Sequence, residues 1–518
     1  MGRVEMRLTQ GLCRAASVRP NGLATVDGDR RRSWREVQDR VARGAAALRA
    51  LGAGAGAHVA VLAMNGDAFF EAYFAILWAG AVIVPLNTRL AAAELAWQLA
   101  DAEVGILLYG EEFAALVDEL RPALPASLVT VALGAETQGS PSYQRAVETA
   151  APAPEVARTN GDLAGIFYTG GTTGRPKGVM LTHQALSAMA MNLIMATKID
   201  DRCVNLHAAP MFHLADIGIF MCTMVAGTHV FIPRLTDDAI LDAVVAHRVT
   251  HIFTVPVVIE RLARHPRSAT VDLSSLRILG YGGAPMPAGG LALARQVFPQ
   301  VDFIQGFGMT EMAAHTFLGP EAHRPDADPA RLRSAGQACY GFELRIVGPD
   351  GAELPRGQLG EIVGRGDNLM TGYWKQPEAT DAALRDGWMH TGDAGYMDDE
   401  GYVFITDRFK DMIISGAENI YSLEVENVLS QHPAVQECAV IGVPDDAWGE
   451  RVHAIIVPKP GMTVALDELA NYARQHIAGY KVPRSLEIRD EPLPRAAAGK
   501  VLKASLRAPY WRGRDRAV

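Results

Sequence analysis

Up to Tyr109, short apolar runs alternate with segments whose hydrophobic residues recur at helical spacing. Residues 33–50, for example, place Val37, Val41, Ala45 and Leu48 on one face of an expected helix. The pattern predicts helices over 33–50, 67–78 and 91–100 and strands over 59–64, 81–85 and 104–109. This alternation is typical of an α/β protein with a parallel sheet.

A polar, proline-rich stretch at about 136–160 is interpreted as a connector, after which the alternation resumes. The pattern then predicts strands over 163–167, 228–232, 251–255, 276–280 and 301–304, and helices over 182–195 and 239–247. Two of the strands run directly into Gly-rich segments, Tyr281–Pro285 and Gln305–Glu311. Such turns at strand ends suggest a ligand crevice at the carboxyl edge of a sheet.

From about residue 335 the expected strands are shorter and the turns richer in glycine, which indicates a β-rich subdomain. Its strands are expected over 342–347, 360–363 and 402–406. Beyond Arg408 the pattern is α+β again, with helices over 423–430 and 466–477 and strands over 435–443 and 454–458. This C-terminal part is long enough to form a separate small domain.

Composition narrows the class of protein. A chain of 518 residues with 49% hydrophobic content is expected to form more than one domain, and a net charge of −9 argues against a nucleic-acid surface. The five cysteines show no C-x-x-C spacing, which favours reduced core thiols in a reducing compartment. Residues 68–86 are the most membrane-like, but Glu71, Gly80 and Pro85 favour a buried helix followed by a strand. We therefore expect a cytoplasmic protein without a transmembrane segment.

The segment Tyr168–Gly178 carries the clearest chemistry in the chain. It contains four glycines, three threonines and Lys177, between an expected strand and a helix that Thr182 can cap. Glycine lets the backbone approach a ligand closely, and the hydroxyls, free N–H groups and ammonium suit the oxygens of a polyphosphate. A flexible surface loop is the plain alternative. A Walker A loop does not fit, because Lys177 lies between Pro176 and Gly178 rather than before Ser or Thr at a helix start.

Five segments in order resemble the motifs of the adenylate-forming superfamily, which includes acyl-CoA and aryl-CoA synthetases, peptide-synthetase adenylation domains and luciferases. They are Tyr168–Gly178, Gln305–Glu311 (with Phe307 in place of the usual tyrosine), Trp388–Asp393, Ile405–Asp411 and Pro494–Lys500. The resemblance covers nearly the whole chain. It implies an α/β fold, with a large N-terminal domain (1–409) of stacked mixed and parallel sheets with helices and a β-rich subdomain. The resemblance also implies a small mobile α+β domain (410–518) that carries a catalytic lysine.

The resemblance also implies the residues that contact ATP. Lys177 and the loop residues Thr169, Gly170, Gly171, Thr172, Thr173 and Gly174 would hold the phosphates. Gly283, Ala284 and Pro285 would face one side of adenine, and Gln305, Gly306, Phe307 and Gly308 the other. Thr310 and Glu311 would serve catalysis, with Glu311 as the Mg²⁺ ligand. Asp393 would bind the ribose, Arg408 and Lys410 belong to the hinge, and Lys500 would bridge the acyl carboxylate and the α-phosphate.

For the acid, the resemblance places His213 at an aromatic position that gates the acyl channel, with a partly buried structural histidine as the alternative. Tyr281 and Gly282 would lie along the wall of the acyl pocket. Small residues nearby (Gly280, Gly282, Gly283, Ala313 and Ala314) favour a medium or long acyl chain or an aryl acid over acetate. Near the expected pantetheine tunnel are Gly416 and Ala417, where CoA-using relatives commonly have glycine in place of Ala417.

The expected activity is that of an AMP-forming acyl-CoA synthetase. A carboxylic acid and Mg·ATP would give acyl-AMP and pyrophosphate, and the thiol of coenzyme A would then displace AMP. The alternatives are a stand-alone adenylating enzyme that loads an acyl carrier protein and a non-catalytic nucleotide-binding regulator. A homodimer is a further expectation. The sequence does not name the acid.

Overall fold

The computed structural model describes residues 6–137, 139–169, 176–232, 234–283, 286, 288–408, 411–415, 418–445, 448–495 and 501–512. The chain divides into two compact units. Unit 1 comprises Met1–Leu332, Gly336–Glu343 and Arg365–Gly387, and unit 2 comprises Arg333–Ala335, Leu344–Gly364 and Trp388–Val518. The β-rich sheet falls in unit 2 with the C-terminal residues, so the boundary at 409/410 stays a prediction.

The larger sheet of unit 1 has nine strands in the described part of the chain, in the order β15-β14-β13-β12-β11-β9-β10-β1-β2. They are β1 (Leu23–Asp27), β2 (Arg30–Ser33), β9 (Val204–Leu206), β10 (Thr228–Phe231), β11 (His251–Thr254), β12 (Ile278–Gly282), β13 (Asp302–Met309), β14 (Ala313–Leu318) and β15 (Gln337–Ala338). The inner strands from β1 to β13 are parallel, whereas β2, β14 and β15 add antiparallel edges. The buried residues of these strands are mostly apolar, as covered parallel strands require, although Asn205 and His229 are also buried.

The second sheet of unit 1 has the order β18-β8-β7-β4-β3-β5-β6 among the described residues. Its strands are β3 (His58–Leu62), β4 (Val82–Pro85), β5 (Ile106–Tyr109), β6 (Val129–Ala132), β7 (Leu163–Thr169), β8 (Lys177–Thr182) and β18 (Gly372–Tyr373). The strands from β6 to β7 pair in parallel, and β8 and β18 are antiparallel. A core of buried aliphatic residues packs on this sheet.

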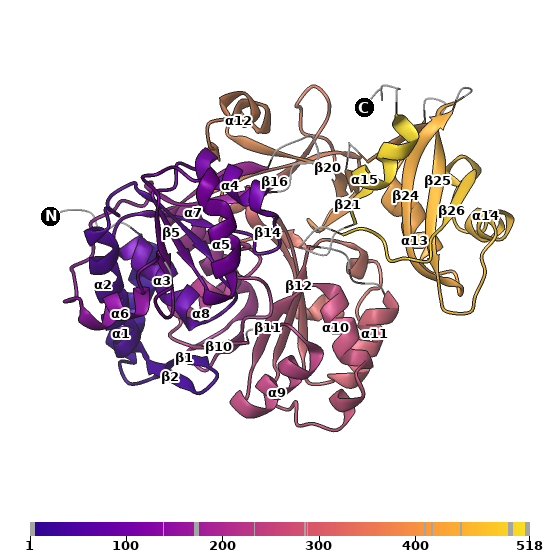
Figure 1. The fold of residues 1–518 in the computed structure, drawn as a ribbon. Helices are drawn as coiled ribbons and strands as arrows, with labels where there is room; N and C mark the ends of the chain where they lie inside the picture. The colour runs from indigo at the N-terminus through magenta and orange to yellow at the C-terminus, as the bar shows by residue number, and fades with distance from the viewer. Residues whose placement is uncertain are drawn as a thin grey trace. The chain divides into compact units, whose positions relative to one another are not determined.

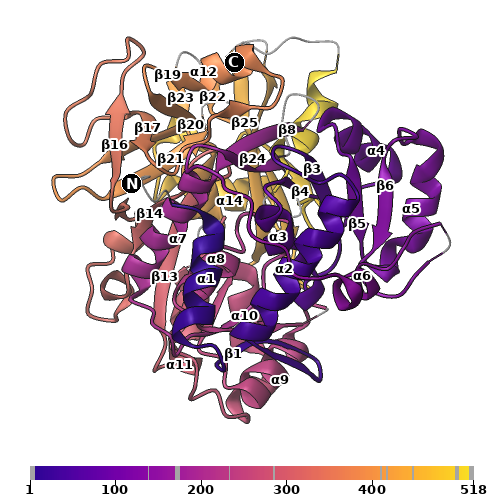
Figure 2. The same cartoon turned by 90° about the vertical axis from the view of Figure 1, so that its left-hand side faces the viewer.

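Helices cover both sheets of unit 1. They are α1 (Leu8–Val18), α2 (Trp34–Ala50), α3 (Asp67–Trp78), α4 (Ala92–Asp101), α5 (Ala114–Leu120), α6 (Tyr143–Thr149), α7 (His183–Thr197), α8 (Gly218–Met224), α9 (Asp237–His247), α10 (Pro256–Arg264), α11 (Ala288–Val297) and α12 (Pro377–Ala383). Figure 1 shows α10 and α11 side by side next to β12, and Figure 2 shows α1 beside α8 and α2.

Helix α3 explains the most membrane-like segment of the sequence. It contacts β1 of the larger sheet and β3 and β4 of the second sheet, so apolar residues are needed all round it. All but one of its residues are buried, and Val82–Pro85 follows as a buried strand, which confirms the prediction of a buried helix and strand. In the described part of the chain, no helix is long and apolar enough to cross a membrane.

The described residues of unit 2 form two sheets. The first consists of β16 (Phe342–Val347), β17 (Gly360–Gly366), β20 (Trp388–Met397) and β21 (Val403–Arg408), and the short β19 (Leu384–Arg385) precedes β20 in the chain. The second consists of β22 (Ile413–Ser415), β23 (Glu418–Ile420), β24 (Val435–Asp445), β25 (Gly449–Pro458) and β26 (Ser485–Ile488). Helices α13 (Ser422–Leu429) and α14 (Leu466–Arg474) pack on one apolar cluster of this sheet, and α15 (Lys503–Arg507) packs on another.

Two sequence-based predictions of local structure were wrong. The connector at 136–160 contains α6, which Ser142 caps and which packs Tyr143 beside Gly44 of α2. The Gly-rich segment after residue 304 continues as strand β13 rather than opening into a turn, because Gly306 and Gly308 pair with β14. A Cβ atom at Gly308 would lie 2.4 Å from the carbonyl oxygen of Ala313, so glycine is needed there for close backbone approach.

Candidate active site

Strands β7 and β8 form a hairpin that brings Thr169 and Lys177 opposite each other in the ladder. Both side chains are half-buried at the mouth of the loop that joins the strands. Gly178 allows this close pairing, since a Cβ atom there would lie 2.8 Å from Cγ2 of Ile166. The loop residues Gly170, Gly171, Thr172, Thr173 and Gly174 lie outside the described residues, so their role in phosphate binding stays a prediction.

After the hairpin, Thr182 ends β8 and caps α7, as expected from the sequence. Its hydroxyl accepts a hydrogen bond of 3.1 Å from the backbone N–H of Ala185. The cap explains why the chain leaves the hairpin directly into a helix. Lys177 therefore sits on a strand that is fixed on one side by β7 and continues into a capped helix.

Glu311 occupies the turn between β13 and β14, next to Thr310. The turn is tight enough to place Ala313 at a positive φ of 54°. Glu311 is buried, with 8% of its surface exposed, and its Oε1 accepts a hydrogen bond of 2.8 Å from the hydroxyl of Tyr373. Thr310 is half-buried beside it. A single carboxylate in this setting suits a divalent cation that takes its other ligands from water and phosphate.

Tyr373 connects the two charged groups that the sequence predicted separately. Its ring lies under the ammonium of Lys177, with Nζ 4.6 Å from the ring centroid, and its hydroxyl reaches Glu311. The structure thus brings Lys177 to the ring face of Tyr373 and Glu311 to its hydroxyl. Sequence reasoning missed Tyr373, for which the only local signal was a glycine followed by two aromatic residues.

Phe307 lies on β13, where the aromatic wall for adenine was predicted. Its ring packs edge-to-face on the buried His315, with centroids 4.4 Å apart and an interplanar angle of 67°. Burial lowers the pKa of His315 to about 4, so this support is a neutral ring at pH 7. Gln305 lies two residues earlier on the same strand. Of the three residues predicted for the opposite wall of the adenine site, only Gly283 is described, and it has a positive φ of 77°. Ala284 and Pro285 lie outside the described residues.

His213 lies on a loop, residues 207–217, that is fixed at several points. The side-chain amide of Asn65 donates to the carbonyl oxygens of His207 (3.0 Å) and Ala209 (2.8 Å) and accepts from the N–H of Met211 (2.8 Å). The two ends of the loop are joined by a hydrogen bond of 2.7 Å between Nδ1 of His207 and the carboxylate of Asp216. The loop therefore holds its residues in one arrangement.

The imidazole of His213 contacts the ring of Phe212, with centroids 4.6 Å apart. Its Nε2 is buried and makes no hydrogen bond within the described part of the chain. Burial, together with the charge of Arg89, lowers the pKa of His213 to about 4. The side chain is thus a neutral, half-buried ring whose Nε2 is unsatisfied within the described part of the chain, unlike a fully satisfied core histidine.

Tyr281 and the glycines around it are largely explained by packing. Tyr281 is 4% exposed, and its hydroxyl donates to Nε2 of His323 at 2.8 Å. Gly280 faces the ring of Phe253, where a Cβ atom would lie 2.3 Å from Cδ1, and Gly282 faces the carbonyl oxygen of Gly306 at 2.6 Å. The space beside Gly280 is therefore filled by Phe253. The acyl-binding roles of Tyr281 and Gly282 stay predictions.

In unit 2, Asp393 lies on β20 and is held by its neighbours. The carboxylate of Glu361 accepts hydrogen bonds from Nδ1 of His390 (2.8 Å) and from the N–H of Gly392 (3.1 Å). Asp393 is 4% exposed, and its N–H donates to the hydroxyl of Thr391 at 3.0 Å. These hydrogen bonds fix the part of β20 that carries the residue predicted to bind the ribose.

The hinge residue Arg408 pairs with Asp393 in the ladder of β20 and β21, and its side chain is not described. Four predicted site residues of unit 2 lie outside the described residues: Lys410, Gly416, Ala417 and Lys500. Their roles stay predictions.

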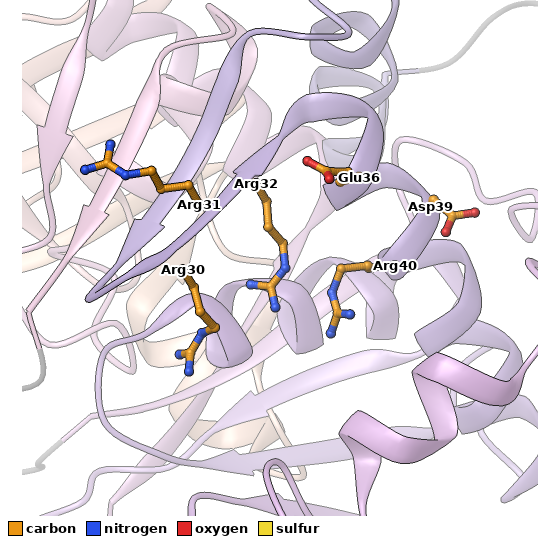
Figure 3. A pocket seen from close by; sticks show the side chains of 6 residues that line it. All are labelled: Arg30, Arg31, Arg32, Glu36, Asp39 and Arg40. Atoms are coloured by element: carbon orange, nitrogen blue, oxygen red, sulfur yellow. The ribbon is translucent and has the colours of Figure 1, made fainter.

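A cavity of about 350 Å³ on unit 1 is lined by charged residues but does not contain any predicted site residue. Figure 3 shows Arg30, Arg32 and Arg40 pointing the same way, with Arg31 pointing away. The arginines that point together are already paired: Arg30 and Arg32 with the buried Asp67, and Arg40 with the buried Glu71. Their charge is compensated inside the protein, so the cavity is not a phosphate site.

The α/β fold, the hairpin lysine and the buried Glu311 together define an enzyme of the adenylate-forming class. The chain belongs to the AMP-binding enzyme family: the family's sequence model matches residues 12–374, and that of the AMP-binding enzyme C-terminal domain matches residues 424–500. Within that family it is an AMP-forming acid–thiol ligase, an enzyme that forms a carbon–sulfur bond with the use of ATP and Mg²⁺.

Individual relatives cover nearly the whole chain. A feruloyl-CoA synthase from Amycolatopsis is 41% identical over 499 residues, which cover 96% of this chain and 98% of that protein. A fatty acid–[acyl-carrier-protein] ligase, ScoC, from Streptomyces coeruleorubidus is 34% identical, with 90% of this chain and 89% of that protein covered. The solved structure of ATP-bound MatB from Rhodopseudomonas palustris has a TM-score of 0.87 at 31% identity and covers 98% of this chain and 99% of that chain.

Proposed function

We propose that this enzyme activates an aryl acid, or a medium- or long-chain fatty acid, as its acyl-adenylate and transfers the acyl group to coenzyme A. In the first half-reaction a carboxylate oxygen attacks the α-phosphorus of ATP and pyrophosphate leaves. In the second, the thiol of coenzyme A attacks the acyl carbonyl carbon and AMP leaves with the oxygen that joined it to the acyl group. The proposal names the acid class and the acceptor, which the family alone leaves open.

The arrangement of Lys177, Tyr373 and Glu311 supports the first half-reaction of this proposal. It places one cation over the ring face of a tyrosine and one carboxylate at the hydroxyl of the same tyrosine, within a single unit. A cation suits the phosphates of the leaving pyrophosphate, and a buried carboxylate suits the metal that accompanies them. Catalysis of phosphoryl and nucleotidyl transfer relies mostly on such positioning and charge stabilisation.

The described residues fit the metal that the family uses. Glu311 presents one carboxylate, and its Oε2 accepts no hydrogen bond within the described part of the chain, which leaves that atom for a cation. When bound, Mg²⁺ would neutralise the charge that accumulates on the phosphate oxygens. Glu311 would hold the metal, and Lys177 would orient the β- and γ-phosphates. The hydroxyl of Thr310 would donate or accept a hydrogen bond beside them.

The remaining roles are proposed from the motif positions. Asp393 would accept hydrogen bonds from the ribose hydroxyls, because hydrogen bonds to Glu361 and Thr391 fix the segment that carries it. Lys500 would bridge the acyl carboxylate and the α-phosphate in the first half-reaction. Lys410 would be the pivot between a domain of residues 1–409 and a domain of residues 410–518. Cytoplasmic residence and a homodimer also stay predictions.

An aromatic acid is favoured over a fatty acid by the most similar of the three relatives described above, which is named as a feruloyl-CoA synthase. His213 adds a chemical argument. A neutral imidazole with an unsatisfied Nε2 can accept a hydrogen bond from a ring hydroxyl, whereas a hydrocarbon chain offers it no partner. A hydroxylated aryl acid would therefore use this position better than a saturated fatty acid.

A carrier-protein acceptor is the second candidate. The ScoC relative is named as a ligase that loads an acyl carrier protein, and Ala417 departs from the glycine common in CoA-using relatives. If the backbone at residue 417 needs a positive φ, the methyl group would cost about 1 kcal/mol. This argument affects only the thioester step.

Pyrophosphate release with a panel of acids and two acceptors tests the proposal. We expect ferulate-type acids to give the highest kcat/KM, saturated fatty acids lower values, and acetate almost none. With coenzyme A as acceptor, the thioester should form as fast as AMP. Acyl transfer only to a phosphopantetheinyl carrier protein, with none to free coenzyme A, would establish the second candidate instead.

A further inference from the structure

Tyr373 is attached to the strand that carries Lys177. It belongs to β18, which pairs with β8 so that Tyr373 lies opposite Val179. Backbone hydrogen bonds on either side complete the attachment: the N–H of Thr371 donates to Met180 (3.0 Å), and the N–H of Trp374 donates to Gly178 (2.7 Å). The position of the tyrosine ring therefore follows the position of the hairpin.

The same segment is also attached to the turn that carries Glu311. The N–H of Met370 donates to the carbonyl oxygen of Glu311 at 2.8 Å, and the side-chain amide of Asn368 donates to the carbonyl oxygen of Met312 at 2.7 Å. The backbone of Tyr373 is also held by α12, since its N–H donates to the hydroxyl of Thr380 at 2.9 Å. Residues 368–374 thus tie the lysine hairpin and the glutamate turn together.

The tyrosine side chain interacts with both charges in different ways. Its hydroxyl donates to Oε1 of Glu311, and its ring face lies 4.6 Å from the ammonium of Lys177. A cation over an aromatic face is stabilised without being neutralised, and a carboxylate that accepts one hydrogen bond keeps its charge and one free oxygen.

We propose that Tyr373 is a positioning residue that orients Glu311 for the metal and holds Lys177 for the phosphates, and that it prevents the two from forming an ion pair. The inference rests on the proposed function, because it takes Glu311 as the metal ligand and Lys177 as the phosphate contact. Removal of a group that orients a metal ligand through a hydrogen bond typically weakens metal affinity by about 10- to 100-fold.

Tyr373→Phe separates the hydroxyl from the ring. The variant keeps the aromatic face under Lys177 and loses the hydrogen bond to Glu311. We expect the affinity for Mn²⁺, measured by electron paramagnetic resonance in the presence of a non-hydrolysable ATP analogue, to fall about tenfold. The binding of metal-free ATP, measured by calorimetry with a chelator present, should change less than twofold. An unchanged Mn²⁺ affinity would overturn the role in orienting Glu311.

The matched control is Tyr109→Phe. Tyr109 is a buried tyrosine of unit 1 whose hydroxyl is hydrogen-bonded to Thr137, outside every motif considered above. The variant should lose a similar amount of thermal stability and keep the wild-type Mn²⁺ affinity. If both tyrosine variants weaken Mn²⁺ binding equally, the effect of Tyr373 is one of general stability and the proposal fails.

Tyr373→Leu tests the second half of the inference. It removes the aromatic face as well as the hydroxyl, so metal-free ATP should bind about five- to tenfold more weakly than it does to Tyr373→Phe, because cation–π stabilisation of the ammonium is lost. Equal ATP affinities for the Phe and Leu variants would overturn the role in holding Lys177. Should the Leu variant not fold, the same comparison is made with Tyr373→Met, which also lacks a ring face and should bind metal-free ATP about five- to tenfold more weakly than Tyr373→Phe.

The wild-type enzyme distinguishes failure of this inference from failure of the proposed function. Acid-dependent pyrophosphate release by the wild type tests only the proposed function. The difference in Mn²⁺ affinity between the wild type and Tyr373→Phe is measured without turnover, so it tests only the role of Tyr373. Pyrophosphate release with no difference in Mn²⁺ affinity would leave the function standing and remove the inference.

Discussion

At the scale of single residues, burial sets the protonation state of His213. His213 has a pKa lowered to about 4, so it is a neutral ring in the pH range where a carboxylic acid substrate is ionised. A neutral imidazole offers shape and one hydrogen-bonding atom without attracting the carboxylate away from the α-phosphate. This is the chemistry expected of a residue that selects among acyl groups and takes no part in adenylation.

His213→Ala should therefore change which acids are used. We expect the ratio of kcat/KM between a hydroxylated aryl acid and a saturated fatty acid to fall about 10- to 100-fold, because the imidazole contact is lost for one acid only. The KM for ATP should stay within twofold. His247→Ala, which removes a histidine of α9, is the control and should leave the ratio unchanged. The same acid ranking with a lower melting temperature would show that His213 is structural.

Local sequence chemistry predicted Lys177 and the family resemblance implied Glu311, but neither indicated Tyr373, which contacts both. Lys177 and Glu311 stand out because each lies beside glycines and threonines in a distinctive segment. Tyr373 lies in no such segment, and its partner Glu311 is 62 positions away. A contact of this kind follows from strand pairing between β18 and β8, which single-sequence patterns do not indicate.

At the scale of elements, hydrophobic periodicity was reliable where an element has one clear environment. The expected helix at 67–78 and the strand that follows it match α3 and β4, because α3 is apolar on all sides and β4 is buried on both faces. The expected helix at 33–50 matches α2, which begins with a capping box formed by Ser33 and Glu36. These segments carry their structural signal within themselves.

Periodicity failed where tertiary contacts override composition. Helix α6 is short and lies in a polar stretch, and it is stabilised by packing Tyr143 and Val147 in the interior. In β13, Gly306 and Gly308 are typical of turns, yet they lie in a strand because neighbouring backbones approach too closely for a side chain. Both errors concern residues whose conformation is set by a distant partner.

For the whole molecule, buried neutral histidines link stability to pH. His183, His213, His315, His323 and His453 each have a pKa lowered to about 4, mainly by burial. The ordinary histidine pKa is about 6.5. Between these values the unfolded chain binds protons that the folded chain does not, so the free energy of unfolding falls as the pH falls from about 6.5 toward 4.

We expect chemical denaturation midpoints to be constant above pH 7 and to decrease steadily from pH 6.5 to pH 5. Each such histidine contributes a slope of about 1.4 kcal/mol per pH unit in that window. His183→Asn should reduce the slope by about one proton equivalent, since His183 is 1% exposed and its Nδ1 has no partner among the described residues. A midpoint that does not change between pH 7 and pH 5 would contradict this assignment.

The acyl-adenylate intermediate is the central claim, and isotope transfer tests it most directly. The acid is supplied with both carboxylate oxygens labelled as ¹⁸O, together with ATP, Mg²⁺ and coenzyme A, and the products are weighed by mass spectrometry. The account predicts AMP carrying one ¹⁸O atom, unlabelled pyrophosphate and a thioester that keeps the other ¹⁸O. Unlabelled AMP, or ADP with labelled inorganic phosphate, would contradict attack of the carboxylate on the α-phosphorus.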